Sequence, residues 1–188
     1  MTRAVATLVR APSYNVPVQV TIRDFHNQDF ETVWRIDQQC FAPGISYSRP
    51  ELAAYMRAAG SFTLVAQSQG AGNPDSPADP GPSSAGEIIG FLVAHANRRG
   101  AGHIITIDVL PRARRSGIGS RLLSAAEERL RAANCSMVQL ETAVDNTSAL
   151  TFYKRHNYSL LRTIPRYYPG GLDAFVLQKN LLSSPPDR

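Results

Sequence analysis

The sequence predicts a single α/β domain in which a mixed β-sheet is flanked by helices. The chain has 188 residues, of which 43% are hydrophobic and 19% charged, as is usual for one soluble globular domain with a sizeable core. Segments in which apolar and polar residues alternate, typical of strands, are interspersed with segments of helical periodicity. Strands with crossover helices and a hairpin at each end give a mixed sheet.

The alternation and the periodicity define the elements in order. The predicted strands are residues 18–25, 61–68, 87–98, 103–110, 136–144, 159–165 and 174–180. The predicted helices are residues 30–41, 51–60, 117–134 and 147–156. Ser48 and Pro50 suit the start of the second helix, because serine caps helix N-termini and proline is favoured in the first turn.

The predicted domain covers residues 18–181 and is preceded by a flexible arm at 1–17 and followed by a flexible tail at 182–188. Residues 69–86 are rich in Pro, Gly, Ser and Asp and are expected to form a disordered hairpin insertion, with a linker between two domains as the alternative. No apolar run reaches the roughly 20 residues that span a bilayer. The short apolar stretch near the start is no convincing signal sequence, so a cytoplasmic location is expected.

The composition limits the kinds of functional site that can be expected. Cys40 and Cys135 are too few for a disulfide framework and are expected to be buried free thiols. The four histidines lack metal-ligand spacing, so no metal is expected. The net charge of +5 favours anionic partners but does not separate nucleic acid from a phosphorylated cofactor.

The stretch RARRSGIG, residues 112–119, follows a strand and opens an amphipathic helix. The first turn of a helix offers unpaired N–H groups and the positive end of its dipole, and Gly117 and Gly119 let a phosphate approach the backbone. A P-loop requires Lys-Ser/Thr where Ser120-Arg121 stands, and a dinucleotide fingerprint requires glycine where Leu122 stands. The turn therefore predicts an anion site that is neither a P-loop nor a dinucleotide fingerprint and that is best suited to a pyrophosphate.

Residues 114–119 resemble the Arg/Gln-x-x-Gly-x-Gly/Ala turn of the GNAT acetyltransferases, with Val109 and Pro111 in their expected places. The resemblance implies the mostly antiparallel GNAT-like sheet and acetyl coenzyme A (acetyl-CoA) as the cofactor. The residues that it assigns to cofactor binding are Ile107, Val109, Arg114, Arg115, Ser116, Gly117, Ile118, Gly119, Ser120 and Asn146. The alternative is an ordinary strand-turn-helix with basic surface residues.

Two further segments extend the resemblance over most of residues 20–181. QLETAVDNTSALTFYKRHNY, residues 139–158, resembles the family segment that carries Glu141, Asn146, Ala149 and Tyr153, although Asn157 replaces its usual glycine. PRYYPGGLDAFVLQKNL resembles the ending of the RimI-like N-terminal acetyltransferases, with leucine in place of the usual methionine. Asparagine tolerates positive φ better than most residues, so the turn at 157 is expected to persist.

The resemblance also implies catalytic roles. Tyr153 aligns with the tyrosine that protonates the departing thiolate, and Glu141 aligns with the glutamate thought to deprotonate the amine. The backbone N–H of Val109 polarises the thioester carbonyl if its strand splays from its neighbour as in the family. The alternatives are a core aromatic for Tyr153 and an exposed strand residue for Glu141.

Asn146 is expected to contact the pantetheine or fix the following turn, or to be only a helix N-cap. Tyr47, Tyr167 and Tyr168 are expected to wall an acceptor groove, with surface packing as the alternative.

Amine chemistry favours the acceptor that the RimI-like resemblance implies. A lysine amine with pKa near 10.4 is about 0.1% neutral at pH 7.4, whereas an α-amine with pKa near 7.7 to 8.0 is about 20–30% neutral. Removing the proton therefore costs roughly 3–4 kcal/mol less for an α-amine than for a lysine amine, so a weaker base in the enzyme suffices.

The sequence therefore predicts transfer of acetyl from acetyl-CoA to a protein N-terminal α-amine, by direct attack in a ternary complex. The expected protein is a monomer or dimer whose partner is an acceptor protein or peptide, without nucleic acid or membrane. Two alternatives remain. One is acetylation of a lysine or small amine; the other is a nucleic-acid-binding domain using Arg98, Arg99 and the arginines at 112–115, although the chain lacks a recognised motif and a stacking platform.

Overall fold

The computed structural model describes residues 19–41, 45–69 and 86–182. The predicted arm at 1–17 lies outside the described residues, as do all of the insertion except Gln69 and Gly86 and all of the tail except Leu182. Within the described ranges, no helix is both long and apolar enough to cross a bilayer.

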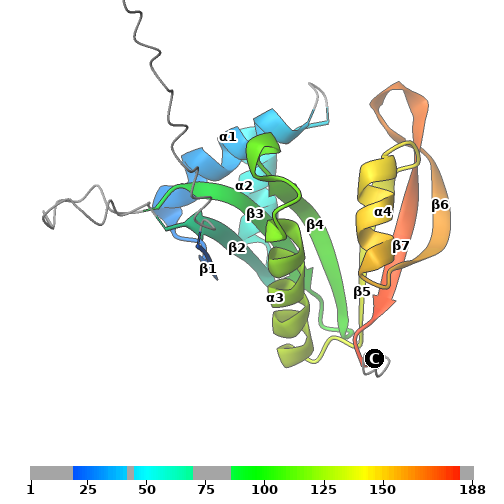
Figure 1. Ribbon diagram of the computed structural model, residues 1–188. Helices are drawn as coiled ribbons and strands as arrows, with labels where there is room; N and C mark the ends of the chain where they lie inside the picture. The colour runs from blue at the N-terminus through cyan, green and yellow to red at the C-terminus, as the bar shows by residue number, and fades with distance from the viewer. Residues whose placement is uncertain (1–18, 42–44, 70–85, 183–188) are drawn as a thin grey trace, which may run out of the picture.

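Seven strands and four α-helices make up the described part of the domain (Figure 1). The strands are β1 (Val20–Asp24), β2 (Ser61–Ser68), β3 (Ile88–Ala96), β4 (Ala101–Val109), β5 (Met137–Ala143), β6 (Ser159–Tyr168) and β7 (Leu172–Asn180). The helices are α1 (Phe30–Cys40), α2 (Arg49–Arg57), α3 (Ile118–Ala132) and α4 (Thr147–Arg155), with short 3-10 turns at Asn27–Asp29, Pro111–Ala113 and Pro169–Gly171. The strands form one sheet in the order β1-β2-β3-β4-β5-β7-β6.

All neighbouring strands of this sheet run antiparallel except β4 and β5, which are parallel. The predicted fold class, a mixed and mostly antiparallel sheet flanked by helices, is therefore confirmed. The β4/β5 pairing extends only from Ala101↔Met137 to His103↔Gln139. Beyond these residues the strands diverge, and the sheet has two arms, β1–β4 and β5–β7–β6.

A β-bulge in the pairing with β3 changes the face on which the side chains of β4 lie, in the part of β4 that is no longer paired with β5. Val93 is paired with Thr106 and Ala94 with Ile104, so Ile105 is an extra residue on β4. Because an extra residue reverses the alternation of side chains, Thr106 and Asp108 continue on the face opposite to that of Ile104.

Helices cover both faces of the sheet. Figure 1 shows α3 and α4 in front of the sheet and α2 behind it. Helix α2 begins as predicted, with Ser48 and Glu51 forming a reciprocal capping box and Pro50 in the first turn. The largest fully buried side chains include Leu52, Phe91, Leu92, Leu122, Leu123, Leu130 and Leu140.

Strand β6 is longer than the sequence predicted, because it continues through Pro165 to Tyr168. Proline is tolerated in this edge strand, which needs no ladder hydrogen bond on its outer side. The pairing of β6 with β7 is irregular between Ile164 and Tyr168, which accommodates the proline. In this stretch Arg166 has a φ of 52° and donates its N–H to Asp173 Oδ1 at 2.8 Å.

A buried carboxylate ties α3 to the β5–β7–β6 arm. Glu127 is only 4% exposed, and its carboxylate accepts hydrogen bonds from Lys179 Nζ at 2.6 Å and from the Tyr158 hydroxyl at 3.1 Å. Arg131 also contacts it at 3.4 Å, which is the i,i+4 pair expected on this helix.

Glu127→Ala is predicted to lower the free energy of unfolding by about 3 kcal/mol, because it leaves a largely buried lysine and a buried hydroxyl without their acceptor. The matched control is Glu128→Ala, on the exposed side of the same helix, which should change the free energy of unfolding by less than about 0.5 kcal/mol. Chemical denaturation measures both values. Equal effects of the two substitutions would contradict this role.

Candidate active site

The turn between β4 and α3 presents free backbone donors. Helical hydrogen bonding begins with the N–H of Arg121, which donates to Gly117 O at 3.0 Å, so the N–H groups of Ile118, Gly119 and Ser120 have no helical acceptor. Gly117 lies at φ 83° with open space where a side chain would stand. These donors, at the positive end of a 15-residue helix, suit a phosphate group.

The arginines near this turn are not equivalent. Arg112 is ion-paired with Glu87, before β3, and is therefore partly neutralised. Arg114 donates from Nε to the carbonyl of Val109 at 2.9 Å. Arg115 is exposed on the turn itself, at φ 62°. Positive charge around the turn thus comes chiefly from Arg114 and Arg115.

The peptide group of Val109 faces the divergence of β4 and β5. The N–H of Leu110 donates to Ile89 O on β3 at 3.0 Å, so the N–H and C=O of the preceding residue point to the other edge of β4. Accordingly, the Val109 carbonyl accepts hydrogen bonds from Arg114 and, at 3.4 Å, from Cys40 Sγ. The Val109 N–H points to the same edge, where β5 has already separated.

Tyr153 lies between the two arms of the sheet. It is 5% exposed and packs edge-on against Phe152 and Tyr158. Burial raises the pKa of its hydroxyl, and the proximity of Asp108 on β4 and Tyr168 on β6 raises this pKa further. The phenol therefore stays protonated at neutral pH and can donate a hydrogen bond.

Glu141 and His103 join the diverging strands. Glu141 Oε2 lies 2.6 Å from His103 Nε2, and the two side chains are 18% and 39% exposed. His103 belongs to the last residue pair of β4 and β5, and Glu141 lies two residues beyond that pair on β5. The carboxylate thus reaches across the narrow end of the divergence.

Four tyrosines form two edge-on pairs, one close to Glu141 and the other beside β4. Tyr47 packs edge-on against Tyr55 with ring centroids 5.2 Å apart, and Tyr167 packs edge-on against Tyr168 at 5.0 Å. Burial raises the pKa of Tyr47, and the proximity of Tyr55, Tyr167 and Tyr168 raises this pKa further. Burial and the proximity of Tyr167 and Glu141 raise the pKa of Tyr168 to about 12. The three predicted acceptor tyrosines are therefore brought together with a fourth, Tyr55.

Buried acids lie behind β4, next to the Val109 peptide. Asp108 is 2% exposed and accepts a hydrogen bond from Thr106 Oγ1 at 2.9 Å, and burial raises its pKa to about 8. Asp37 of α1 is fully buried; it accepts a hydrogen bond from the Tyr47 N–H at 2.9 Å, and burial raises its pKa to about 6. Its Oδ1 has no hydrogen-bond partner within the described residues.

The remaining predicted residues flank these groups. Ile107 lies on β4, two residues before Val109, and is partly buried against the core. The Asn146 side chain caps α4, accepting a hydrogen bond from the Ala149 N–H at 3.1 Å. Ser120 Oγ contacts Nε2 of His156, the residue that follows α4, at 2.9 Å, which joins the two helices beside the glycine turn. Ser116 Oγ donates to Ala113 O at 2.6 Å within that turn.

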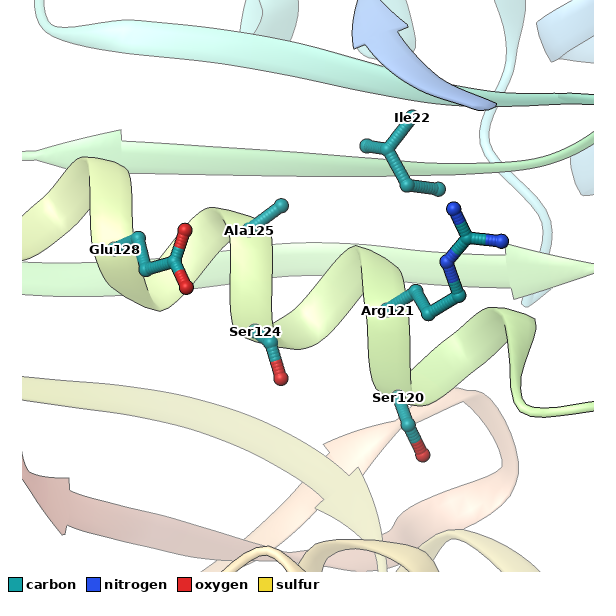
Figure 2. A pocket seen from close by; sticks show the side chains of 6 residues that line it. All are labelled: Ile22, Ser120, Arg121, Ser124, Ala125 and Glu128. Carbon is teal, nitrogen blue, oxygen red and sulfur yellow. The ribbon is translucent and has the colours of Figure 1, made fainter. Parts of the chain in front are cut away.

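A separate hollow of about 310 Å³ lies along α3 beside β1. Its lining residues are Ile22, Ser120, Arg121, Ser124, Ala125 and Glu128. In Figure 2, Arg121 reaches toward Ile22, while Ser120 and Ser124 point away from β1. None of the residues at the β4/β5 divergence except the turn residue Ser120 lines this hollow. The groups described above lie instead along the β4/β5 divergence, which is the candidate active site.

Sequence reasoning did not identify His103, Tyr55 or Asp108 as site residues. His103 lies near the start of its strand, and only strand pairing brings it to Glu141, 38 residues later. A polar residue at an inward-facing strand position was the one available signal for Asp108. No group of three His, Cys, Asp or Glu side chains that could hold a metal occurs in the part of the chain that the structure describes.

The fold is a splayed mixed sheet with an anion-binding glycine turn at the start of α3, and comparison with known proteins gives the family. The model of the Acetyltransferase (GNAT) family matches residues 30–158. The chain therefore belongs to the GNAT acetyltransferase family.

Individual proteins agree with this assignment. The chain is 35% identical over 77 residues to an N-alpha-acetyltransferase of Sulfurisphaera tokodaii, a match that covers 40% of this chain and 46% of that protein. The chain spans about half the length of the curated relatives it matches. The structure of Ard1 from Thermoplasma volcanium superposes with a TM-score of 0.72 and 27% identity, covering 87% of this chain and 99% of that one. The ribosomal-protein-S18-alanine N-acetyltransferase from Escherichia coli shares the fold, with a TM-score of 0.70 and 17% identity over 90% of this chain and 99% of that one.

Asp108→Asn is predicted to stabilise the protein increasingly as the pH rises. The folded-state pKa of Asp108 lies above its ordinary value of 3.8, so its contribution to stability is fully present below about pH 4 and is lost as the pH rises through about 8. Asparagine keeps the shape of the neutral acid and does not ionise. The denaturant midpoint of the variant relative to wild type should rise between pH 5 and pH 8.5.

Asp145→Asn, at an exposed site in the β5–α4 turn, is the matched control and should show no such trend. A constant difference between Asp108→Asn and wild type across this range would mean that Asp108 is ionised throughout it.

Proposed function

We propose that this protein is an N-acetyltransferase of the RimI-like kind, which transfers the acetyl group of acetyl-CoA to the N-terminal α-amine of a protein or peptide. The observation that carries the proposal is the β4/β5 divergence, along which the Val109 N–H, the buried Tyr153 hydroxyl and the His103–Glu141 pair lie. Acetyl-CoA would supply an acetyl group bound as a thioester.

The residues of this chain fit such a cofactor. The free N–H groups of Ile118, Gly119 and Ser120 would hold its pyrophosphate, with Arg114 and Arg115 adding positive charge. The Val109 N–H points to the edge that β5 has left, where it would polarise the thioester carbonyl. Asn146, at the start of α4, would lie beside the pantetheine.

The groups on the acceptor side suit an α-amine. Glu141 provides the negative charge that favours removal of a proton from the amine. Aromatic walls made by Tyr47, Tyr55, Tyr167 and Tyr168 would hold an extended peptide end, since tyrosines supply contact area together with hydrogen-bonding hydroxyls. N-alpha-acetyltransferases among the relatives support the same acceptor.

The proposal is tested by release of free thiol from acetyl-CoA with two matched peptides. One has a free α-amine and no lysine, and the other has a blocked α-amine and one internal lysine. Release with the first peptide only is the expected result, because an α-amine is far more often neutral at pH 7.4. Release with the second only would move the function to lysine acetylation, and silence with both would point to a small amine.

Tyr153→Phe is predicted to lower kcat at least tenfold, because the departing sulfur loses its hydrogen-bond donor, while the dissociation constant of coenzyme A stays within about twofold. Steady-state kinetics and calorimetry measure the two quantities. Tyr158→Phe is the matched control, since it removes the hydroxyl of the adjacent buried tyrosine, which donates to Glu127 instead. This control should lose stability and keep its kcat; a fully active Tyr153→Phe enzyme would refute the role of Tyr153.

A further inference from the structure

Helix α4 meets the glycine turn at two places. Ser120 Oγ, in the first turn of α3, lies 2.9 Å from Nε2 of His156, the residue that follows α4. The ring of Phe152 lies against the backbone of Gly119, because a side-chain carbon added to this glycine would stand 3.4 Å from Phe152 Cε2. Both contacts involve turn residues whose N–H groups have no helical acceptor. The C-terminal half of α4 therefore packs on the same turn that is proposed to hold the pyrophosphate.

The ring of Phe152 connects these contacts to Tyr153. Its centroid lies 4.7 Å from that of the His156 ring and 5.1 Å from that of the Tyr153 ring. The Tyr153 hydroxyl makes no hydrogen bond to any residue that the structure describes, so the packing of its ring and the placement of α4 determine where it lies. Because closely packed side chains transmit a displacement to their neighbours, a shift of α4 away from the turn would also move this hydroxyl.

The contact between Ser120 and His156 is a hydrogen bond between neutral groups. Burial lowers the pKa of His156; the nearby Glu127 opposes this shift and Lys179 adds to it, so the imidazole is neutral at pH 7.5. A serine hydroxyl both donates and accepts, so either imidazole tautomer can form the bond. Within the described ranges, no other hydrogen bond joins residues 146–156 to α3. This bond is therefore the polar contact that sets the distance between the two helices beside the turn.

We propose, on the basis of the proposed function, that Ser120 and His156 are positioning residues whose hydrogen bond holds α4 against the glycine turn and thereby places Tyr153 for its role at the departing sulfur. The bond uses only the hydroxyl of Ser120, so the backbone N–H of the same residue stays available to the pyrophosphate. One residue thus connects the phosphate-binding end of the site with the proton donor. In this role neither the Ser120 hydroxyl nor the imidazole needs to touch the reacting atoms.

The first experiment removes the bond from each side, using the peptide with a free α-amine. Ser120→Ala keeps the backbone N–H and should lower kcat at least about fivefold, because small displacements of a catalytic group are costly, while the Kd of coenzyme A stays within about twofold. His156→Leu should have a similar effect, and His156→Gln, which keeps a hydrogen-bonding side chain, should have a kcat at least about threefold above that of His156→Leu. The matched control is Ser124→Ala, at an exposed position one turn further along α3, which should stay within about twofold of wild type in both quantities.

The Tyr153→Phe background separates positioning from a general loss of structure. If the bond acts through Tyr153, adding Ser120→Ala to Tyr153→Phe should change the residual kcat by less than about twofold, because coupled residues are not additive. A further loss as large as the one in the wild-type background would overturn the proposal. Unchanged kcat in Ser120→Ala would also overturn it, and weaker coenzyme A binding in that variant would then assign the hydroxyl to the phosphate instead.

A second readout does not need turnover. Aromatic ¹H–¹³C spectra of the free protein, in which Tyr153→Phe identifies the signals of Tyr153, should show these signals shifted in Ser120→Ala and unshifted in Ser124→Ala. Unshifted Tyr153 signals in Ser120→Ala would overturn the proposal. If wild type acetylates neither peptide, the proposed function fails, whereas the spectra still decide whether the hydrogen bond positions Tyr153.

Discussion

The site depends on a single departure from regular sheet geometry, the early end of pairing between β4 and β5. These are the only parallel neighbours in the described sheet, and they share hydrogen bonds over just three residue pairs. Had the pairing continued, β5 would occupy the edge of β4 to which the Val109 N–H points, and a ladder hydrogen bond would use this donor. The divergence therefore leaves a backbone donor available for binding.

Several contacts hold the arms in this arrangement. Glu127 on α3 binds Lys179 of β7 and Tyr158 at the start of β6, and the ring of Tyr158 in turn packs against Tyr153. Ser120 of α3 contacts His156 at the end of α4. The burial of carboxyl groups with raised pKa values behind β4 is costly unless they are protonated, and such groups are more common near functional sites than elsewhere.

The sequence was sufficient for features encoded locally. The turn at 114–120 and the helix that follows it depend on neighbouring residues, and so does the left-handed conformation at Asn157, which is observed with a φ of 65°. The sequence was insufficient to predict contacts that depend on strand register and on the packing of helices. The 2.6 Å contact between His103 and Glu141 depends on the pairing of two strands that a helix separates in the sequence. The contact of the Tyr55 ring with Tyr47 depends on how α2 packs. The extension of β6 past Pro165 was missed because proline reads as a strand end unless the strand is known to be at an edge.

The central claim is that the divergence of β4 and β5, together with the turn after β4, forms the cofactor site. Amide ¹H–¹⁵N spectra recorded during a titration with coenzyme A test this most directly, because each backbone N–H reports separately. The predicted result is that the largest shifts occur at Val109 and at residues 116–120, with small shifts along the β1 side of α3 around Glu128. Large shifts confined to the hollow beside β1, with Val109 and Gly119 unchanged, would contradict the account.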